Sequence, residues 1–289
     1  MAGIWWLASY PKSGNTWVRA VIAGLLSGRP VDINAMGFLG PICSHRFFLD
    51  DTLGIETAEL SVEQETDLRP RAYEIWAAEA KRRLYCKVHD AYQVTPAGEP
   101  LFPTSPTLGA VYVVRDPRAV AVSFAHHMAR PIDEAIKRME DSAAVLSGST
   151  TRLPRQLRQQ LLRWGDHVES WLAAPFPIHL LRYEDIQADP LSAFTRMAAF
   201  LELPSDFAMV VAATEAAAFT RLQAQERDSG FFEKPHGAST FFREGSVDGW
   251  RRVLTPEQCA RIVASHGAVM RRLGYDVTLA PLSAEQGMA

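Results

Sequence analysis

The residues best suited to chemistry in this sequence form a short loop near the N-terminus. The segment from Ser9 to Trp17 reads Ser-Tyr-Pro-Lys-Ser-Gly-Asn-Thr-Trp, and helical spacing follows it to about Leu26. Free backbone N–H groups at a helix start, beside a lysine and small hydroxyl side chains, make a binding site for phosphate or sulfate. The loop does not fit the Walker pattern, which ends in Gly-Lys-Ser/Thr, because Lys12 here precedes Gly14. The alternative interpretation is a plain turn between a strand and a helix.

A second segment with anion-binding residues runs from Val111 to Ser123. It begins as an apolar strand, ends that strand at Arg115, and turns at a proline into a helix. Arg115 should leave the edge of a sheet while Ser123 lies two turns into the helix, so both side chains could reach one anion. The structural alternative is an ion pair between Arg115 and Asp116 or Glu184.

His89 is the best candidate for a general base among the eight histidines. It follows the apolar run from Leu84 to Val88, so it should emerge at the sheet edge where ligands bind, and a neutral imidazole accepts protons near neutral pH. Lys87 could orient an anionic group there, or be a solvated lysine. The adjacent His126 and His127 point to different faces of a helix, so we expect no joint metal site and interpret them as acceptor-pocket or packing residues.

The elements that must position these residues follow an alternating pattern. Short runs rich in Val, Ile and Leu alternate with stretches of helical period, which predicts an α/β fold of three layers, with a parallel sheet and helices on both faces. The predicted strands are Ile4 to Ser9, Arg83 to Val88, Ala110 to Val114 and Ile178 to Arg182. The best-defined predicted helices are Leu161 to Leu172, Leu191 to Leu201, and the segment from the N-cap Thr255 to about Gly274.

Composition indicates one globular domain over residues 1–289, with a tail from about residue 277 that we expect to be loosely held. The net charge of -3 argues against a protein that coats nucleic acid, and no apolar run is long enough to span a membrane. Cys43, Cys86 and Cys259 match neither a zinc spacing nor a disulfide framework, so we expect a cytoplasmic protein. The oligomeric state stays open.

Both anion-binding segments resemble motifs of the sulfotransferases that use PAPS (3′-phosphoadenosine 5′-phosphosulfate), in that family's order. The first is similar to Tyr-Pro-Lys-Ser-Gly-Thr-Thr-Trp, and only Asn15 departs from it, with a side-chain amide that can still donate to a phosphate oxygen. The second is similar to the motif for the 3′-phosphate. The resemblance implies a P-loop nucleotide-kinase-like sulfotransferase fold, with PAPS as sulfuryl donor and PAP as product. The sulfuryl group would pass by in-line displacement to a hydroxyl or amine of a small-molecule acceptor. No metal is expected.

A third segment, Phe241 to Trp250, is similar to the family's element that closes over the 3′-phosphate. Glu244 stands where lysine is usual, and Asp248-Gly249 reverses the usual order. An acid cannot neutralise a phosphate, so we assign the contact to Arg243 and to the backbone of Gly245.

The resemblance also implies roles for individual residues. The residues expected to hold the donor are Lys12, Ser13, Gly14, Asn15 and Thr16 at the 5′-phosphosulfate, Trp17, Tyr183 and Phe219 near the adenine, and Arg115, Ser123, Phe241, Arg243, Glu244 and Gly245 around the 3′-phosphate. The Lys87-Val88-His89 sequence looks like the family's Lys-Thr-His element, which makes His89 the base. Lys12 would stabilise the bridging oxygen of the leaving phosphate, and Lys87 would orient the sulfonate.

The stretch from Arg227 to Glu244 contains glycines and four phenylalanines, which suggests either a lid that excludes water or plain packing. Two other functions stay open: a small-molecule kinase of related fold, and a non-catalytic nucleotide-binding protein. A kinase should carry Gly-Lys-Ser/Thr and an acidic residue for Mg²⁺, and the first is missing.

Overall fold

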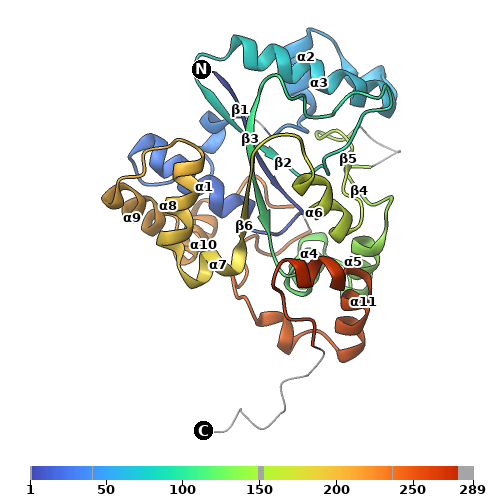
Figure 1. The fold of residues 1–289 in the computed structure, drawn as a ribbon, viewed down its shortest axis with the longest axis vertical. Helices are drawn as coiled ribbons and strands as arrows, with labels where there is room; N and C mark the ends of the chain where they lie inside the picture. Colours follow the sequence, from blue (N-terminus) through green and yellow to red (C-terminus); the bar gives the residue numbers. More distant parts are fainter. Residues whose placement is uncertain (1, 41, 149–152, 236, 279–289) are drawn as a thin grey trace.

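The central sheet is parallel, as predicted. The computed structural model describes residues 2–40, 42–148, 153–235 and 237–278, and most of the predicted loose tail lies outside them. Within this described part, four parallel strands form one sheet in the order β2-β1-β3-β6 (Figure 1). Their bounds are β1 Gly3–Ser9, β2 Arg83–Val88, β3 Thr107–Val114 and β6 Ile178–Arg182. A short antiparallel pair, β4 (Val145–Leu146) and β5 (Gln159–Gln160), lies beside it.

Alternating side chains of the sheet feed two separate cores, because successive residues of a strand point to opposite faces. In β1, Trp6 packs with the aromatic rings of Tyr73 and Phe102, whereas its neighbour Trp5 packs against Phe200 in the other core. A strand buried on both faces needs a continuous apolar sequence, and β1 is buried along its whole length. The sheet is therefore the middle layer of three, which confirms the predicted fold class.

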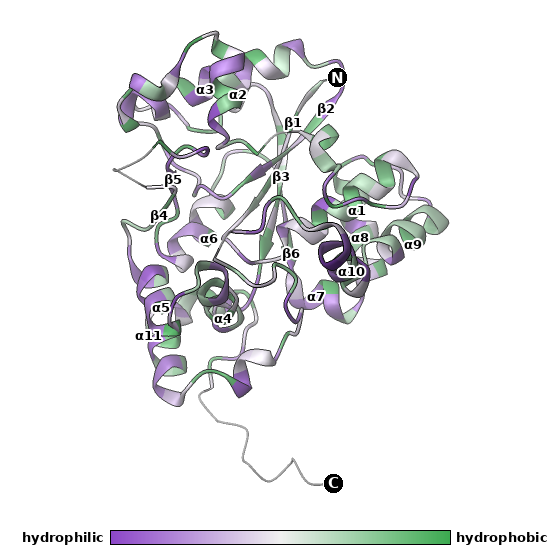
Figure 2. Ribbon diagram, turned by 180° about the vertical axis from the view of Figure 1, so that it is seen from behind, coloured by the Kyte–Doolittle hydropathy of each residue, from purple (hydrophilic) through white to green (hydrophobic). Residues whose placement is uncertain are grey.

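Helices cover both faces of the sheet (Figure 1). The helices packed in the core of Trp6 are α2 (Arg46–Leu53), α3 (Val62–Glu79), α4 (Pro117–Met128), α5 (Ile132–Glu140), α6 (Trp164–Leu172) and α11 (Pro256–Arg272). Those packed in the core of Trp5 are α1 (Asn15–Ser27), α7 (Tyr183–Ala188), α8 (Pro190–Phe200), α9 (Phe207–Ala216) and α10 (Phe219–Ser229). Short 3-10 turns are η1 (Met36–Leu39), η2 (Thr57–Glu59) and η3 (Gly249–Arg252). Figure 2 contrasts the hydrophobic α1 and α9 with the hydrophilic α10.

The predicted boundaries hold within a few residues. Thr255 caps α11 by accepting from the backbone N–H of Gln258, whose side chain bonds back to the Thr255 N–H. The helix predicted from Leu161 begins only at Trp164, and β3 begins three residues before the predicted Ala110. The early start of β3 includes Gly109, where the φ of 156° and the close Trp5 ring leave no room for a side chain.

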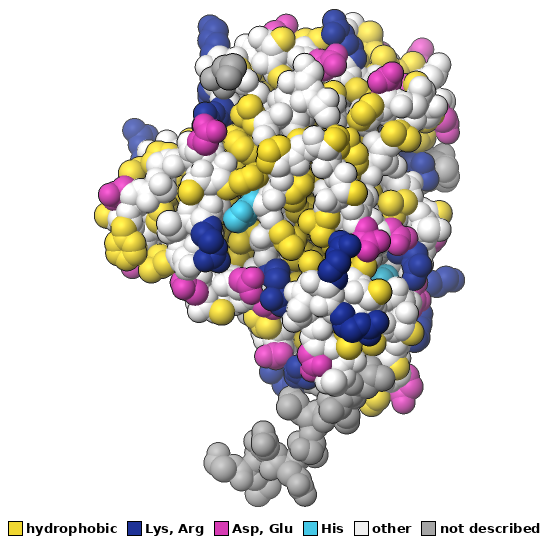
Figure 3. Space-filling model, viewed as in Figure 1, with side chains coloured by type: hydrophobic (Ala, Val, Ile, Leu, Met, Phe, Trp, Pro, Cys, Tyr) yellow, Lys and Arg dark blue, Asp and Glu magenta, His cyan; other side chains and the backbone are white. Residues whose placement is uncertain are grey.

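The four strands end at one edge of the sheet, and each carries a candidate site residue just beyond its carboxyl end. Lys12 follows β1, His89 follows β2, Arg115 follows β3 and Tyr183 follows β6. In open parallel sheets, the crevice at this edge is where ligands bind. On the face drawn in Figure 3, acidic and basic side chains are interspersed.

Candidate active site

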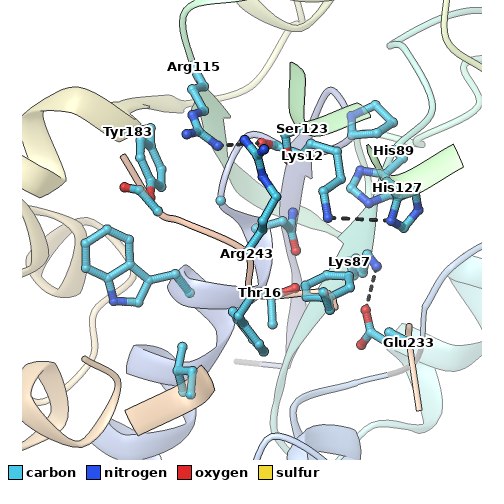
Figure 4. A pocket seen from close by; sticks show the side chains of 18 of the residues that line it. Lys12, Thr16, Lys87, His89, Arg115, Ser123, His127, Tyr183, Glu233 and Arg243 are labelled. Carbon is cyan, nitrogen blue, oxygen red and sulfur yellow. Dashed lines mark hydrogen bonds and ion pairs between the residues drawn. The ribbon is translucent and has the colours of Figure 1, made fainter. Parts of the chain in front are cut away.

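A cavity of about 450 Å³ opens at the carboxyl edge of the sheet. Lys12 and Arg115 both line it, as does His89, so the turns after β1, β2 and β3 meet in one space (Figure 4). The other predicted site residues in its wall are Gly14, Asn15, Thr16, Trp17, Lys87, Ser123, Tyr183, Phe219, Phe241, Arg243, Glu244 and Gly245. Ser13 does not line the cavity. Its side chain is fully buried, and its hydroxyl has no hydrogen-bond partner in the described part of the chain.

The loop after β1 exposes the start of α1 to the cavity. Lys12 and Gly14 both have positive φ, 70° and 108°, which lets the chain turn sharply from strand to helix. A Cβ atom on Gly14 would lie 2.8 Å from the Tyr183 ring, so glycine is required there for space as well. No side chain of the described residues caps α1. Its first backbone N–H groups are therefore left for an anionic ligand.

Asn15 contributes less to anion binding than its sequence position predicted. Its side-chain amide donates to the Leu7 carbonyl at 2.8 Å and to the Ser9 hydroxyl at 3.3 Å. Both amide hydrogens are thus used to fasten the start of α1 to the end of β1. The group that Asn15 can offer to an anion is its backbone N–H, and the expected side-chain donation to phosphate is corrected accordingly.

Lys12 is a buried cation among other cations. Its Nζ lies 3.9 Å above the centre of the Phe241 ring and 3.5 Å from Nδ1 of His127. Burial, together with the charges of Lys87 and Arg115, lowers the pKa of Lys12 to about 7. An anion placed in the cavity would reverse this effect by stabilising the charged form.

Arg115 bridges the loop after β1 and the segment from Phe241 to Trp250, which is called the C-terminal element below. It donates to the backbone carbonyls of Ser246 at 2.8 Å and Lys12 at 3.4 Å, and its guanidinium lies 4.2 Å from the centre of the Tyr183 ring. Its buried Nε has no partner among the described residues, which leaves a donor for a ligand. The alternative ion pairs do not form, because Asp116 pairs with Arg118 at 2.6 Å and Glu184 accepts from the Asp116 N–H.

The protonation state of His89 is fixed by its contacts. Its Nδ1 lies 2.8 Å from the backbone carbonyl of Ser9, which can only accept, so Nδ1 carries the hydrogen. Burial and the nearby charge of Lys87 hold the pKa of His89 well below its ordinary value. The ring is therefore neutral near pH 7, and Nε2, which has no hydrogen-bond partner among the described residues, holds a free lone pair.

Lys87 is engaged rather than solvated. Its Nζ donates to Glu233 Oε2 at 2.7 Å (Figure 4). The other oxygen of Glu233 accepts from Arg19 at 2.5 Å. Burial raises the pKa of Glu233, but the charges of Lys87 and Arg19 outweigh it and bring the value to about 2. Burial lowers the pKa of Lys87, while the Glu233 charge opposes that shift.

The C-terminal element compensates for its unusual acid. Glu244 forms ion pairs with Arg252 at 2.5 Å and with Arg243 at 3.5 Å. The reversed Asp248-Gly249 order fits this arrangement, because a Cβ atom on Gly249 would lie 2.9 Å from a Glu244 carboxylate oxygen. Gly245, with φ 67°, accepts from the Tyr183 hydroxyl at 2.8 Å through its carbonyl. The element is thus fastened to the strand ends that carry the cavity.

The predicted lid region begins after α10 rather than at Arg227, because that helix extends to Ser229. Phe231 packs against Phe241 with ring centres 4.8 Å apart, and the two carboxylate oxygens of Glu226 accept from the backbone N–H groups of residues 241 and 242 at 2.6 and 2.8 Å. Phe232 is 63% exposed at the cavity mouth. This region therefore covers the cavity with packed aromatic rings.

Sequence reasoning missed Glu233 and Arg19 as site residues. No motif marks either residue, and they are 214 positions apart in the chain. His127, which the sequence placed in an acceptor pocket or in the packing, lines the cavity, and burial beside Lys12 lowers its pKa to about 3. Its partner His126 instead lies 3.0 Å from the Thr240 carbonyl.

Within residues 2–278, apart from the undescribed positions, no group of three or more His, Cys, Asp or Glu side chains is placed to hold a metal ion. The helices of this same portion are all too short or too polar to traverse a lipid bilayer.

Known proteins resemble this chain along most of its length. A family model described as the sulfotransferase domain matches residues 4–274. An amine sulfotransferase of Oryctolagus cuniculus is 26% identical over 159 residues, which is 52% of this chain and 50% of that protein. Cytosolic sulfotransferase 17 of Arabidopsis thaliana is 24% identical over 275 residues, which is 89% of this chain and 71% of that protein. The match to the first relative thus spans only about half of that relative's length.

Solved structures share the fold. The crystal structure of a mouse sulfotransferase complexed with PAP matches with a TM-score of 0.58 and 20% identity, over 93% of this chain and 85% of that one. At this level of identity the likeness is one of fold, and the parallel sheet with its flanking helices is what the two chains have in common.

Proposed function

The chain belongs to the sulfotransferase domain family, and from that membership we propose that it transfers a sulfuryl group from PAPS to a hydroxyl group of a small-molecule acceptor. One observation carries the proposal: Lys12, His89 and Arg115 line the same cavity although they follow three different strands. The mouse structure that shares this fold was solved with PAP, which is the product of such a donor.

The cavity suits a nucleotide with phosphate groups at both ends. Lys12 and the uncapped start of α1 line the cavity, and so do Ser123 and Arg115, whose buried Nε has no partner among the described residues. We assign the 5′-phosphosulfate to the first group and the 3′-phosphate to the second. We assign the adenine to Trp17, Tyr183 and Phe219, which line the same cavity. Trp17 meets Tyr183 edge-on with ring centres 5.7 Å apart.

The reaction we infer is an in-line displacement at sulfur. His89 Nε2 takes the proton of the acceptor hydroxyl, a new bond forms between that oxygen and sulfur, and the bond from sulfur to the bridging phosphate oxygen breaks. The Lys12 ammonium stabilises the negative charge that develops on the bridging oxygen, and Lys87 donates to the sulfuryl oxygens. The protein therefore supplies positioning, charge and one proton acceptor.

A neutral hydroxyl fits the cavity better than an amine. The carboxylates among its lining residues are Glu233 and Glu244, and each is already paired with arginine or lysine side chains. A protonated amine would thus meet the cations of the site without a free carboxylate, and it could not attack until it lost its proton. Apolar residues in the cavity wall, such as Ile42, Leu146 and Phe232, suit a partly apolar acceptor.

The direct test is incubation with PAPS and a panel of phenols, alcohols and amines, with mass spectrometry of the products. We expect sulfated phenols or alcohols and equimolar PAP. A kinase or a non-catalytic nucleotide-binding protein would give no sulfated product. The cytosolic naming of one relative and the free thiols of all three cysteines support a cytoplasmic location for this reaction.

A further inference from the structure

One carboxylate joins three parts of the site. Glu233 lies in the loop of residues 230–235 that follows α10, and it contacts Lys87 at the end of β2 and Arg19 in α1. The three side chains expose 5%, 11% and 4% of their surfaces, so water screens this cluster little. Figure 4 shows Glu233 reaching toward Lys87 beside the ring of His89. The cluster therefore lies next to the reacting groups, not in a remote part of the core.

Lys87 would be hard to keep charged without this partner. The charged and titratable groups that face it are the cations Arg19 and Lys12, the neutral rings of His89 and His127, and the carboxylate of Glu233. Burial and like charges both favour loss of its proton. Glu233 supplies the negative charge in direct contact, and it uses only one of the three N–H groups of the ammonium.

From this geometry we propose that Glu233 is a positioning residue for sulfuryl transfer, which keeps the Lys87 ammonium charged and aimed into the cavity. This inference rests on the proposed function, because it assigns Lys87 to the sulfuryl oxygens. Through Arg19 the same carboxylate holds the loop of residues 230–235 against α1. The position of this loop and the charge of Lys87 therefore both depend on Glu233. The role is absent from the motifs, since Glu233 lies outside all of them.

A purely structural role would have a different signature. If Glu233 only held the loop in place, its loss would lower activity by the same factor at every pH. If it keeps Lys87 charged, then without it Lys87 releases its proton at lower pH, and activity falls as pH rises through a range that the wild type tolerates. His89 cannot produce this change, because it is neutral across that range.

The experiment compares kcat with pH for the wild type and Glu233→Gln at saturating PAPS, where the donor keeps Lys12 paired. We expect kcat of the variant to fall by about 100-fold at pH 8.5 but only about tenfold at pH 6.5. A loss of about 100-fold is the scale seen when an enzyme loses one hydrogen-bond donor to the charge that develops in the transition state. Affinity for PAP, which lacks the sulfuryl group that we assign to Lys87, should change much less than kcat. Glu233→Asp should restore part of the wild-type profile.

Two further variants keep the result interpretable. Glu233→Gln leaves the two buried cations Arg19 and Lys87 without a counter-charge, which can unfold the chain. The double variant Arg19→Met/Glu233→Gln restores the wild-type net charge of the cluster, but Lys87 still lacks its anion. It should show the same displaced profile. Glu202→Gln removes a surface ion pair with Arg83 at the other end of β2 and should leave the profile unchanged.

The outcomes separate the two proposals. If the wild type makes no sulfated product, the proposed function is wrong. The role of Glu233 is overturned if the wild type is active and the folded variants Glu233→Gln and Arg19→Met/Glu233→Gln keep its pH profile, whatever their absolute rates.

Discussion

At the scale of single residues, the site depends on two groups whose pKa values lie below those they would have in water. Lys12 holds its proton weakly, with a pKa of about 7, and His89 is neutral well below the ordinary pKa of imidazole. Both effects come from burial and from neighbouring cations. An anionic ligand would therefore be favoured next to Lys12, and the neutral ring of His89 beside it can accept a proton.

His89→Ala should abolish turnover, with a loss of about 10²- to 10⁴-fold, because the acceptor proton then has no base within reach. PAP affinity should survive, since the proposed nucleotide contacts do not include His89. Steady-state rates and calorimetric titration with PAP check both parts. A near wild-type rate would show that another group is the base.

PAP binding should weaken as pH rises above 7. The pKa of free Lys12 is about 7, so the cation is increasingly lost at higher pH, and each unit then costs the nucleotide up to about tenfold in affinity for this one group. Titrations at pH 6.5 and 8.5 measure the trend. Lys12→Met should bind weakly at both pH values and lose this dependence. An equally steep dependence in that variant would assign the effect elsewhere.

At the scale of elements, strand ends and tight turns decide where these side chains meet. The strands were predictable because each contains a short apolar run, even where it includes a charged residue such as Lys87 in β2. The turns that carry Lys12, Gly14 and Arg115 were predictable because these residues occur in ordered motifs. The contact of Glu233 with Arg19 and Lys87 was not, since it depends on how a motif-free loop folds back across the sheet edge. The prediction that the Asn15 amide donates to a phosphate was wrong for a related reason, because this amide donates instead to the backbone carbonyl of Leu7.

Gly14→Ala should damage donor binding more than stability. The added Cβ meets the Tyr183 ring at 2.8 Å and forces a positive φ on a residue with a side chain, a strain of about 1–3 kcal/mol that the loop can relieve only by moving. We expect at least about tenfold weaker PAP binding, the equivalent of 1.4 kcal/mol. Gly28→Ala is the matched control, since Gly28 also has positive φ, 61°, but meets no neighbour there and lies at the far end of α1. Equal effects on PAP affinity in the two variants would contradict the role of the loop.

At the scale of the whole molecule, the cavity joins parts of the chain that are far apart in sequence. The N-terminal loop, the strand ends and the segment around residue 245 all contribute to its wall. A ligand that contacts all of them stabilises the folded state by mass action.

Saturating PAP should therefore raise the melting temperature. At 100 times the dissociation constant the gain is about 2.7 kcal/mol, which corresponds to a few degrees for a chain of this size. Differential scanning fluorimetry measures it. Arg115→Ala should lose about half of the shift or more at the same PAP concentration, and an undiminished shift would place PAP away from Arg115.

The most direct measurement is a calorimetric titration of wild type and Arg115→Ala with PAP and with adenosine 5′-phosphate, which lacks the 3′-phosphate. If Lys12 and Arg115 hold opposite ends of one nucleotide, Arg115→Ala should weaken PAP binding by about 10- to 100-fold, the scale of one charge-assisted contact, and leave the monophosphate nearly unaffected. An equal loss for both ligands, or no loss for either, would contradict a single nucleotide held between these two residues.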